Sequence, residues 1–302
     1  MDNVQDYEVR LTENVLKSNY KTLTDAQLRR ISENLERLNV IHKWNKTKGA
    51  GVKIGIIDTG VDINHVDLRH CIQRAYNAFN GSTDVRDVQG HGTHVAGVLA
   101  GDGIMKGVAP ESKLYVAKGL DDNGSGTINS LIQSLNWCIN QNVDIITMSL
   151  GINVPIPIME TAINYATSRG IICVAAAGND GYGRHDVISI DYPAAYENTI
   201  AVGAIDMNRK SAYFSSIGNV DVVTFGVDVI STFPNNRYAA LSGTSMATPY
   251  ITGAIALIQS NAKNRLGRRL TLEEIRMMLI LNAVDLGEPG YDNVYGYGKF
   301  QF

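Results

Sequence analysis

Ser245 stands in a setting that could make its hydroxyl a nucleophile. It belongs to Gly243-Thr244-Ser245, which lies just ahead of an apolar run from Tyr250 to Ile258. A serine on a turn at the start of a helix faces free backbone N–H groups and the positive end of the helix dipole. Both features favour negative charge on whatever the serine attacks.

Three polar sites stand where functional groups gather in open parallel sheets, beyond the carboxyl ends of strands. Asp58, Asn179 and Ser149 each follow a strand candidate. A fourth residue, His91, stands between two glycines ahead of a helix of small residues. Each motif alone is common. Their joint presence is what carries the prediction.

Serine hydrolysis needs a hydroxyl nucleophile, a histidine that takes and returns its proton, a carboxylate that orients the histidine, and donors for the oxyanion. The chain offers one candidate for each role, in the order Asp58, His91, Asn179 and Ser245. We therefore predict hydrolysis through an acyl-enzyme.

The elements that must position these residues are short β-branched runs that alternate with helical stretches from Lys53 onward. This alternation predicts an α/β fold in three layers: a mostly parallel central sheet with helices on both faces. The strand candidates are Val52–Ile57, Lys113–Ala117, Asp144–Met148, Ile171–Ala175, Thr199–Ala204 and Val220–Val223. The helix candidates are His94–Ala100, Thr127–Asn140, Pro157–Arg169, Tyr250–Gln259 and a last helix that a capping box at Thr271 opens.

The N-terminal part divides at another capping box, which begins at Thr24. Apolar residues then recur at helical intervals as far as Leu38, which predicts an amphipathic helix packed on the main body. No repeat or linker follows. We predict a short extension, residues 1–23, and a single domain, residues 24–302.

Composition narrows the class of protein. The 302 residues are 44% apolar and 19% charged, which is typical of a globular protein. With 27 basic and 30 acidic residues, the net charge of −3 gives no general attraction to nucleic acid or to an anionic membrane. The three cysteines show no disulfide or zinc spacing.

The N-terminus lacks the apolar core of a signal peptide, and no apolar run reaches the length of a membrane span. These features predict a cytoplasmic enzyme. Export by a route without a signal peptide is the alternative.

These motifs together resemble the subtilisin family of serine proteases, the subtilases, from about Leu38 to Gly298. The matching segments are Asp58-Thr59-Gly60, His91-Gly92-Thr93-His94-Val95-Ala96-Gly97, Ser149-Leu150-Gly151, Ala176-Ala177-Gly178-Asn179 and Gly243-Thr244-Ser245-Met246-Ala247-Thr248-Pro249. The Asp, His, Ser order of the triad is that of subtilisin.

The resemblance implies a serine endopeptidase with a role for each residue. Asp58 would orient His91, His91 would act as general base and acid, and Ser245 would be the nucleophile. Asn179 and the Ser245 N–H would form the oxyanion hole. In organisation the chain looks most like the intracellular subtilisins that have no signal peptide.

Substrate-binding segments carry over as well. Gly124-Ser125-Gly126 and Ser149-Leu150-Gly151 match the two segments that hold an extended peptide as a β-strand between them. The partner that the family implies is therefore a peptide or a protein substrate.

Asp191 departs from the commonest form of the family, in which the pocket-floor position is often small or uncharged; Asp180 stands at the rim. A carboxylate at the floor of a partly desolvated pocket favours a paired cation. This predicts a preference for Arg or Lys before the scissile bond. The alternative is that Asp191 turns outward or holds a cation.

Calcium is the one cofactor that the resemblance raises, and the chemistry itself requires none. The segment Ala100–Pro110 is shorter than the loop that carries the tight calcium site of secreted subtilisins, so we expect that site to be missing. A weaker structural site remains a candidate, because hard cations take several oxygen ligands. Its candidate ligands are the carbonyls of Ala194, Tyr196 and Thr199 and the carboxylate of Asp221.

Residues 1–23 are too few for the folded prodomain of secreted subtilisins. They resemble the brief extension of intracellular subtilisins, whose prosegment can lie across the cleft. We predict that this extension restrains activity.

Other functions explain the motifs less well. Aspartic proteases also carry Asp-Thr-Gly, but they need two such loops and this chain has one. His91, His94 and Asp58 lack the i, i+4 histidine spacing of helical zinc sites. A non-catalytic peptide-binding scaffold on the same fold remains the alternative, although all four catalytic positions are filled. General intracellular proteolysis and the maturation of a dedicated precursor both stay open.

Overall fold

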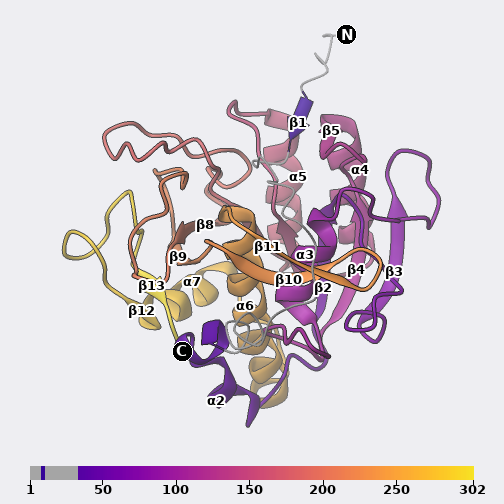
Figure 1. Ribbon diagram of the computed structural model, residues 1–302, viewed down its shortest axis with the longest axis horizontal. Coiled ribbons are helices and arrows are strands. Elements are labelled where there is room, and N and C mark those ends of the chain that lie inside the picture. Colours follow the sequence, from indigo (N-terminus) through magenta and orange to yellow (C-terminus); the bar gives the residue numbers. More distant parts are fainter. Residues whose placement is uncertain (1–7, 11–32) are drawn as a thin grey trace.

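A computed structural model describes residues 8–10 and 33–302 of the chain. Its centre is a nine-stranded sheet in the order β12-β13-β9-β8-β7-β6-β2-β4-β3. Figure 1 shows how the helices are arranged around this sheet. Every neighbouring pair is parallel except β12 and β13. The strands are β2 (Lys53–Asp58), β3 (Ile72–Asn77), β4 (Lys113–Lys118), β6 (Ile145–Met148), β7 (Ile172–Ala176), β8 (Thr199–Ile205), β9 (Val222–Phe225), β12 (Ala283–Val284) and β13 (Lys299–Phe300).

Helices cover both faces of this sheet, so the predicted α/β architecture is confirmed. They are α2 (Val40–Trp44), α3 (His91–Ala100), α4 (Ile128–Asn140), α5 (Pro157–Ser168), α6 (Thr244–Leu266) and α7 (Leu272–Leu281). The residues of β2 show the two layers, because alternate side chains of a strand point to opposite faces. Ile54 and Ile56 belong to the core that contains α3 and α6, whereas Ile57 belongs to the core that contains α4 and α5.

Helix α6 is buried from Thr244 to Ser260, as its apolar run predicts. It begins six residues before the predicted start, because the residues from Thr244 to Pro249 are helical and buried as well. Thr248 and Thr252 satisfy their hydroxyls by donating to backbone carbonyls one turn earlier, at 2.8 and 3.0 Å. The first turn therefore joins the buried helix to Ser245.

Two small antiparallel sheets complete the structure: β1 (Glu8–Arg10) pairs with β5 (Ser125–Thr127), and β10 (Val229–Phe233) pairs with β11 (Arg237–Leu241). The second pair was not predicted. Its turn contains Asn235 and Asn236, both with positive φ (66° and 54°), which is the conformation that tight hairpin turns need.

The capping box at Thr271 is confirmed, because Glu274 N–H donates to Thr271 Oγ1 at 3.3 Å and Thr271 N–H donates to Glu274 Oε2 at 2.9 Å. The capping box predicted at Thr24 lies outside the described residues. Residues 33–37, the end of that predicted helix, are helical.

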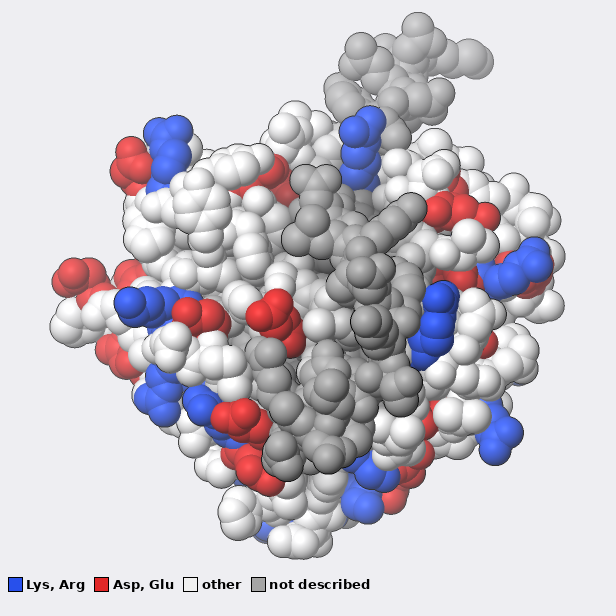
Figure 2. All heavy atoms as spheres, viewed as in Figure 1, with Lys and Arg blue, Asp and Glu red and all other residues white. Residues whose placement is uncertain are grey.

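Charges of both signs intermingle over the face shown in Figure 2, in keeping with the small net charge. Among the described helices, none has both the length and the hydropathy that crossing a bilayer takes.

Candidate active site

The four predicted catalytic residues lie at the ends of elements that adjoin one another. Strands β7, β6 and β2 are neighbours in the sheet. Asp58 is the last residue of β2, and Asn179 follows β7 by three residues. His91 and Ser245 lie in the first turns of α3 and α6, which pack against each other. One edge of the sheet therefore brings all four residues together.

Asp58 and His91 form a buried pair. His91 Nδ1 lies 2.7 Å from Asp58 Oδ1, and both side chains are at most 1% exposed. Thr59 N–H donates to the same carboxylate oxygen at 2.7 Å. Since Asp58 accepts at Nδ1, that nitrogen carries the proton and Nε2 is the basic nitrogen, which is the tautomer that a general base needs.

Gly92 allows this close approach. A Cβ at Gly92 would lie 2.0 Å from the Gly60 carbonyl oxygen and 3.1 Å from Asp58 Oδ1. Any side chain would push α3 away from the loop that follows β2.

Asp87 connects the loop after β2 with the start of α3, and it was not predicted from the sequence. Its carboxylate accepts from Gly90 N–H at 2.8 Å, from Thr93 N–H at 2.9 Å and Thr93 Oγ1 at 2.6 Å, and from Thr59 Oγ1 at 2.9 Å. Burial raises its pKa. Its signal was an acidic residue shortly before a helix, where it can cap free N–H groups.

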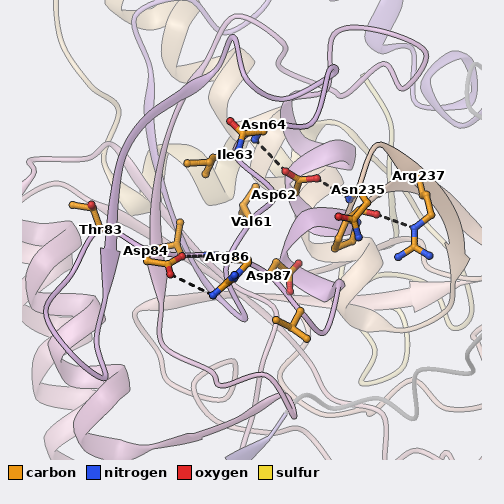
Figure 3. Close-up of a pocket in the computed structure, with 13 residues that line it drawn as sticks. Val61, Asp62, Ile63, Asn64, Thr83, Asp84, Arg86, Asp87, Asn235 and Arg237 are labelled. Carbon is orange, nitrogen blue, oxygen red and sulfur yellow. Dashed lines mark hydrogen bonds and ion pairs between the residues drawn. The ribbon is translucent and has the colours of Figure 1, made fainter.

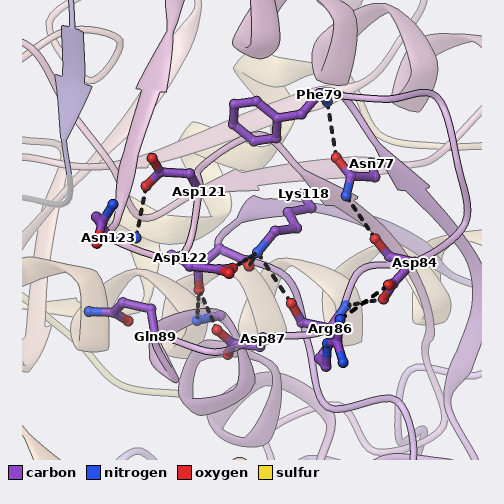
Figure 4. A network of polar contacts seen from close by, with 12 residues as sticks. Asn77, Phe79, Asp84, Arg86, Asp87, Gln89, Lys118, Asp121, Asp122 and Asn123 are labelled. Atoms are coloured by element: carbon purple, nitrogen blue, oxygen red, sulfur yellow. Dashed lines mark hydrogen bonds and ion pairs between the residues drawn. The ribbon is translucent and has the colours of Figure 1, made fainter.

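Lys118, at the end of β4, joins three loops near the site (Figure 4). Its ammonium donates to the carbonyl oxygens of Thr59 at 2.5 Å and Arg86 at 3.2 Å, and to Asp122 Oδ1 at 2.8 Å. These partners belong to the loop after Asp58, the loop before α3 and the turn before β5. Lys118 therefore connects the turn before β5, a predicted substrate-binding segment, to the loops beside Asp58 and His91.

Ser245 and Ser149 exchange hydrogen bonds. Ser245 Oγ donates to the Ser149 carbonyl at 3.1 Å, and Ser149 Oγ donates to the Ser245 carbonyl at 3.0 Å. The first turn of α6 is thereby attached to the end of β6. The Ser245 N–H lies in that turn, at the N-terminal end of the helix.

Asn179 is oriented by Thr244. Its Oδ1 accepts from Thr244 N–H at 3.0 Å and lies 3.1 Å from Thr244 Oγ1. Because the two ends of an amide point in opposite directions, Nδ2 faces away from Thr244. This is the orientation that an oxyanion donor requires.

His94 has a structural role. Its buried Nε2 lies 2.9 Å from the Val229 carbonyl and 3.2 Å from the Ala239 carbonyl, and burial lowers its pKa to about 3. A neutral imidazole thus ties the β10–β11 hairpin to α3. In the described ranges, no three His, Cys, Asp or Glu side chains are grouped so as to hold a metal ion.

The two predicted substrate strands have residues 8–10 between them. Val9 is paired with Gly126 of β5, and Arg10 with both Ser125 and Gly151. Gly151 N–H donates to the Arg10 carbonyl at 3.4 Å. Val9 is fully buried in the apolar core that includes Leu150. Both strand edges therefore accept an extended backbone.

Comparison with known proteins agrees with this geometry: the model of the subtilase family matches residues 49–298. The chain belongs to the subtilase family. It is 40% identical to an intracellular serine protease of Paenibacillus polymyxa over 272 residues, 87% of this chain and 83% of that protein. It is 38% identical to the major intracellular serine protease of Bacillus subtilis (strain 168), covering 87% of each. Subtilisin Savinase of Lederbergia lenta is 43% identical over 83% of this chain and 88% of that protein. The chain is a subtilisin-type serine endopeptidase.

In this subtilase, Asp191 is buried, with 4% of its surface exposed, so it does not turn outward. A Cβ added at Gly178 would lie 2.6 Å from Asp191 Oδ2, and one added at Gly151 would lie 2.9 Å from it. The carboxylate thus lies between Gly151, in a predicted substrate-binding segment, and Gly178, the residue before Asn179. Burial, followed by the charge of Asp180, raises the pKa of Asp191 to about 7.

Asp191 has no internal partner in the part of the chain that the structure describes. No N–H group, hydroxyl or basic side chain there donates to its carboxylate. Asp180, at the rim, is exposed and accepts from the Tyr182 hydroxyl at 3.2 Å.

The four candidate calcium ligands of this subtilase are brought together, but around an arginine. Ala194, Tyr196, Thr199 and Asp221 line a cavity of about 400 Å³ that Arg276 of α7 also lines. Arg276 donates to Asp221 and to the Thr199 carbonyl.

A second cavity, of about 490 Å³, lies beside the loop that leads to His91 (Figure 3). That loop contributes Asp84 and Arg86, which lie 3.6 Å apart as an exposed ion pair. On the opposite side, Asn235 N–H donates to Asp62 Oδ2 at 2.8 Å. Because Asp84 and Arg86 are exposed, the side of the cavity that they line is open to solvent.

Proposed function

We propose that this serine endopeptidase prefers Arg or Lys immediately before the scissile bond. The observation that carries the proposal is the buried Asp191 carboxylate, which has no donor among the described residues. A desolvated carboxylate must either bind a proton or gain a cation. A substrate guanidinium or ammonium group supplies that cation, whereas an apolar side chain leaves the carboxylate without a partner.

Matched peptides that differ only in Arg or Phe before the cut test this preference. We expect higher kcat/KM for Arg, and a fall of about 10- to 100-fold in the Arg-to-Phe ratio for Asp191→Asn, because hydrogen bonds to charged groups contribute about 1.5–3 kcal/mol. The control is Asp180→Asn, an exposed carboxylate at the rim, with a much smaller effect. Equal or better cleavage after Phe by the unmodified enzyme would refute the proposal.

The preference should also depend on pH. Asp191 has a pKa of about 7, so it is mostly neutral at pH 6 and mostly ionised at pH 8.5. Only the ionised form pairs with Arg, so the Arg-to-Phe ratio of kcat/KM should rise about fivefold or more over this interval. Protonation of His91 affects both substrates equally and cancels in the ratio. Asp191→Asn should make the ratio independent of pH.

Restraint by the N-terminal extension, residues 1–23, is the second part of the proposal. It is supported by Val9 and Arg10, which take the place of a substrate between Gly126 and Gly151. An extended segment paired on both sides excludes a second peptide from the same edges.

Removing residues 1–23 should raise kcat/KM for a short peptide about tenfold or more and speed labelling of Ser245 by a fluorophosphonate. In the full chain, Val9→Asp should act the same way, because a buried charge without a partner costs several kcal/mol. Ile104→Asp, at a position 56% exposed, is the matched control and should change neither rate. Unchanged turnover and labelling after the deletion would contradict the restraint.

For the biological role, we propose a cytoplasmic enzyme that acts on peptides or proteins and not on nucleic acid or membranes. The relatives named intracellular serine proteases support this location. A cleavage profile on proteome-derived peptides separates the two candidate roles. A broad upstream preference indicates general proteolysis, whereas a narrow one indicates maturation of a dedicated precursor. Absence of fluorophosphonate labelling at Ser245 in folded protein would favour the scaffold alternative.

A further inference from the structure

The side chain of Arg276 is directed at a set of oxygen atoms that could otherwise bind a metal cation. Its Nε donates to Asp221 Oδ1 at 3.1 Å, and its Nη2 donates to the Thr199 carbonyl at 3.0 Å and to the Glu197 carbonyl. The arginine comes from α7, and the acceptors come from the turn before β8, the first residue of β8 and the residue just before β9. The Arg276 side chain is 29% exposed and that of Asp221 is 16% exposed.

We propose that the Arg276 guanidinium is a built-in cation that takes the place of a metal ion at this position. A hard cation such as Ca²⁺ needs six to eight oxygen ligands at about 2.3–2.6 Å. Here the nearby oxygens already have donors, since Ala201 N–H donates to Asp221 Oδ2 at 2.8 Å and Thr199 N–H donates to the Tyr196 carbonyl at 3.0 Å. A metal ion would also have to displace a like charge that the chain itself carries. The residues present therefore do not fit calcium.

The planar guanidinium suits these acceptors, because its directed N–H groups reach oxygens that diverge from one another. It also ties α7 to the sheet, since its acceptors lie at the starts of β8 and β9. Because Arg276 is part of the chain, its occupancy of the site does not vary with the ion concentration. This part of the fold is then independent of calcium.

Removing the guanidinium should expose a latent metal site. Burial raises the pKa of Asp221, and Arg276 is the charge that opposes this shift. Without Arg276, the carboxylate is left beside the Thr199 and Glu197 carbonyls and an enlarged cavity. A small cation can then supply the missing charge.

Thermal unfolding of the full chain in the inactive Ser245→Ala background tests the proposal, with chelator-treated protein titrated with CaCl₂. The quantity compared is the rise in Tm on adding calcium, so that any calcium site elsewhere cancels between variants. Arg276→Ala should show an extra rise of about 5 °C at 100 times the Kd of the new site. Adding Asp221→Asn should abolish the extra rise.

Two controls keep the result specific. Arg276→Lys retains a positive charge and should show no extra rise. Arg268→Ala removes an arginine near α7 whose exposed pair with Glu274 has no part in the oxygen cluster, and it should match the parent. The same calcium response in Arg276→Ala as in the parent would overturn the proposal.

The parent itself gives a second measurement, which does not depend on how Arg276→Ala folds. In the Ser245→Ala chain with Arg276 intact, Asp221→Asn should leave the calcium binding isotherm unchanged. Loss of one bound calcium on that substitution would show that a metal binds here in spite of the arginine, and would overturn the proposal.

Discussion

Replacing Asp58 by asparagine should lower kcat about 10⁴-fold and leave KM for a matched peptide within about threefold, a magnitude measured on subtilisin itself and on other serine proteases. Asp58 Oδ1 accepts from His91 Nδ1 at 2.7 Å in a buried setting. An asparagine can present an N–H group there instead and stabilise the wrong tautomer of His91. It also removes the charge that favours the imidazolium in the transition state.

Steady-state kinetics of the purified variant, with folding checked by circular dichroism, measures this effect. Asp102→Asn is the control, since Asp102 is half exposed, is paired with Lys106 and lies outside the catalytic loops. It should change kcat less than twofold. A loss below tenfold in folded Asp58→Asn, or a loss that appears only in KM, would mean that Asp58 does not orient the catalytic histidine.

Asn179→Ala should lower kcat about 10²- to 10³-fold with little change in KM; this is the loss measured on subtilisin for the corresponding asparagine. The side chain of Asn179 is held through its oxygen by Thr244, so its N–H group can stabilise negative charge that develops in the transition state. Since the substrate carbonyl in the ground state carries little of this charge, the effect should fall on kcat.

Thr244→Val is the matched variant for this argument. It removes the hydroxyl, which lies 3.1 Å from Asn179 Oδ1 and also accepts from Gly178 N–H at 3.2 Å, but keeps the backbone N–H donor at 3.0 Å. Asn179 itself loses one neutral hydrogen bond, which contributes about 0.5–1.5 kcal/mol, so kcat should fall only about 2- to 10-fold, and loss of the Gly178 contact should lower the stability of the fold.

In Asn179→Ala, the affinity for a peptide boronic acid should fall in parallel with kcat/KM. An unchanged boronic acid affinity would contradict the oxyanion role.

The strands that could be predicted from the sequence are those in which nearly every residue is buried. Strands β2, β4 and β6 to β9 are apolar along most of their length, so runs of β-branched residues marked them to within about two residues. Strand β3 lies at the edge of the sheet and is half exposed, so it lacks such a run.

The β10–β11 hairpin shows why some buried strands escape a hydrophobic pattern. Ser231 and Thr232 are fully buried, because their hydroxyls donate to the carbonyls of His94 and Thr93, each at 2.7 Å. A polar residue can be buried when a distant segment accepts its hydrogen bond. The sequence around the hairpin does not contain that partner.

The family and the candidate catalytic residues could be predicted from the sequence, because Asp58, His91, Asn179 and Ser245 each stand in a local motif whose residue types the chemistry requires. The surroundings of the other charged groups became visible only in the folded structure. It left Asp191 buried without a donor among the described residues, and it directed Arg276 at Asp221, 55 positions away. The physical reason is that the partner and the desolvation of a charge depend on which distant segments pack beside it, and no local pattern records that packing.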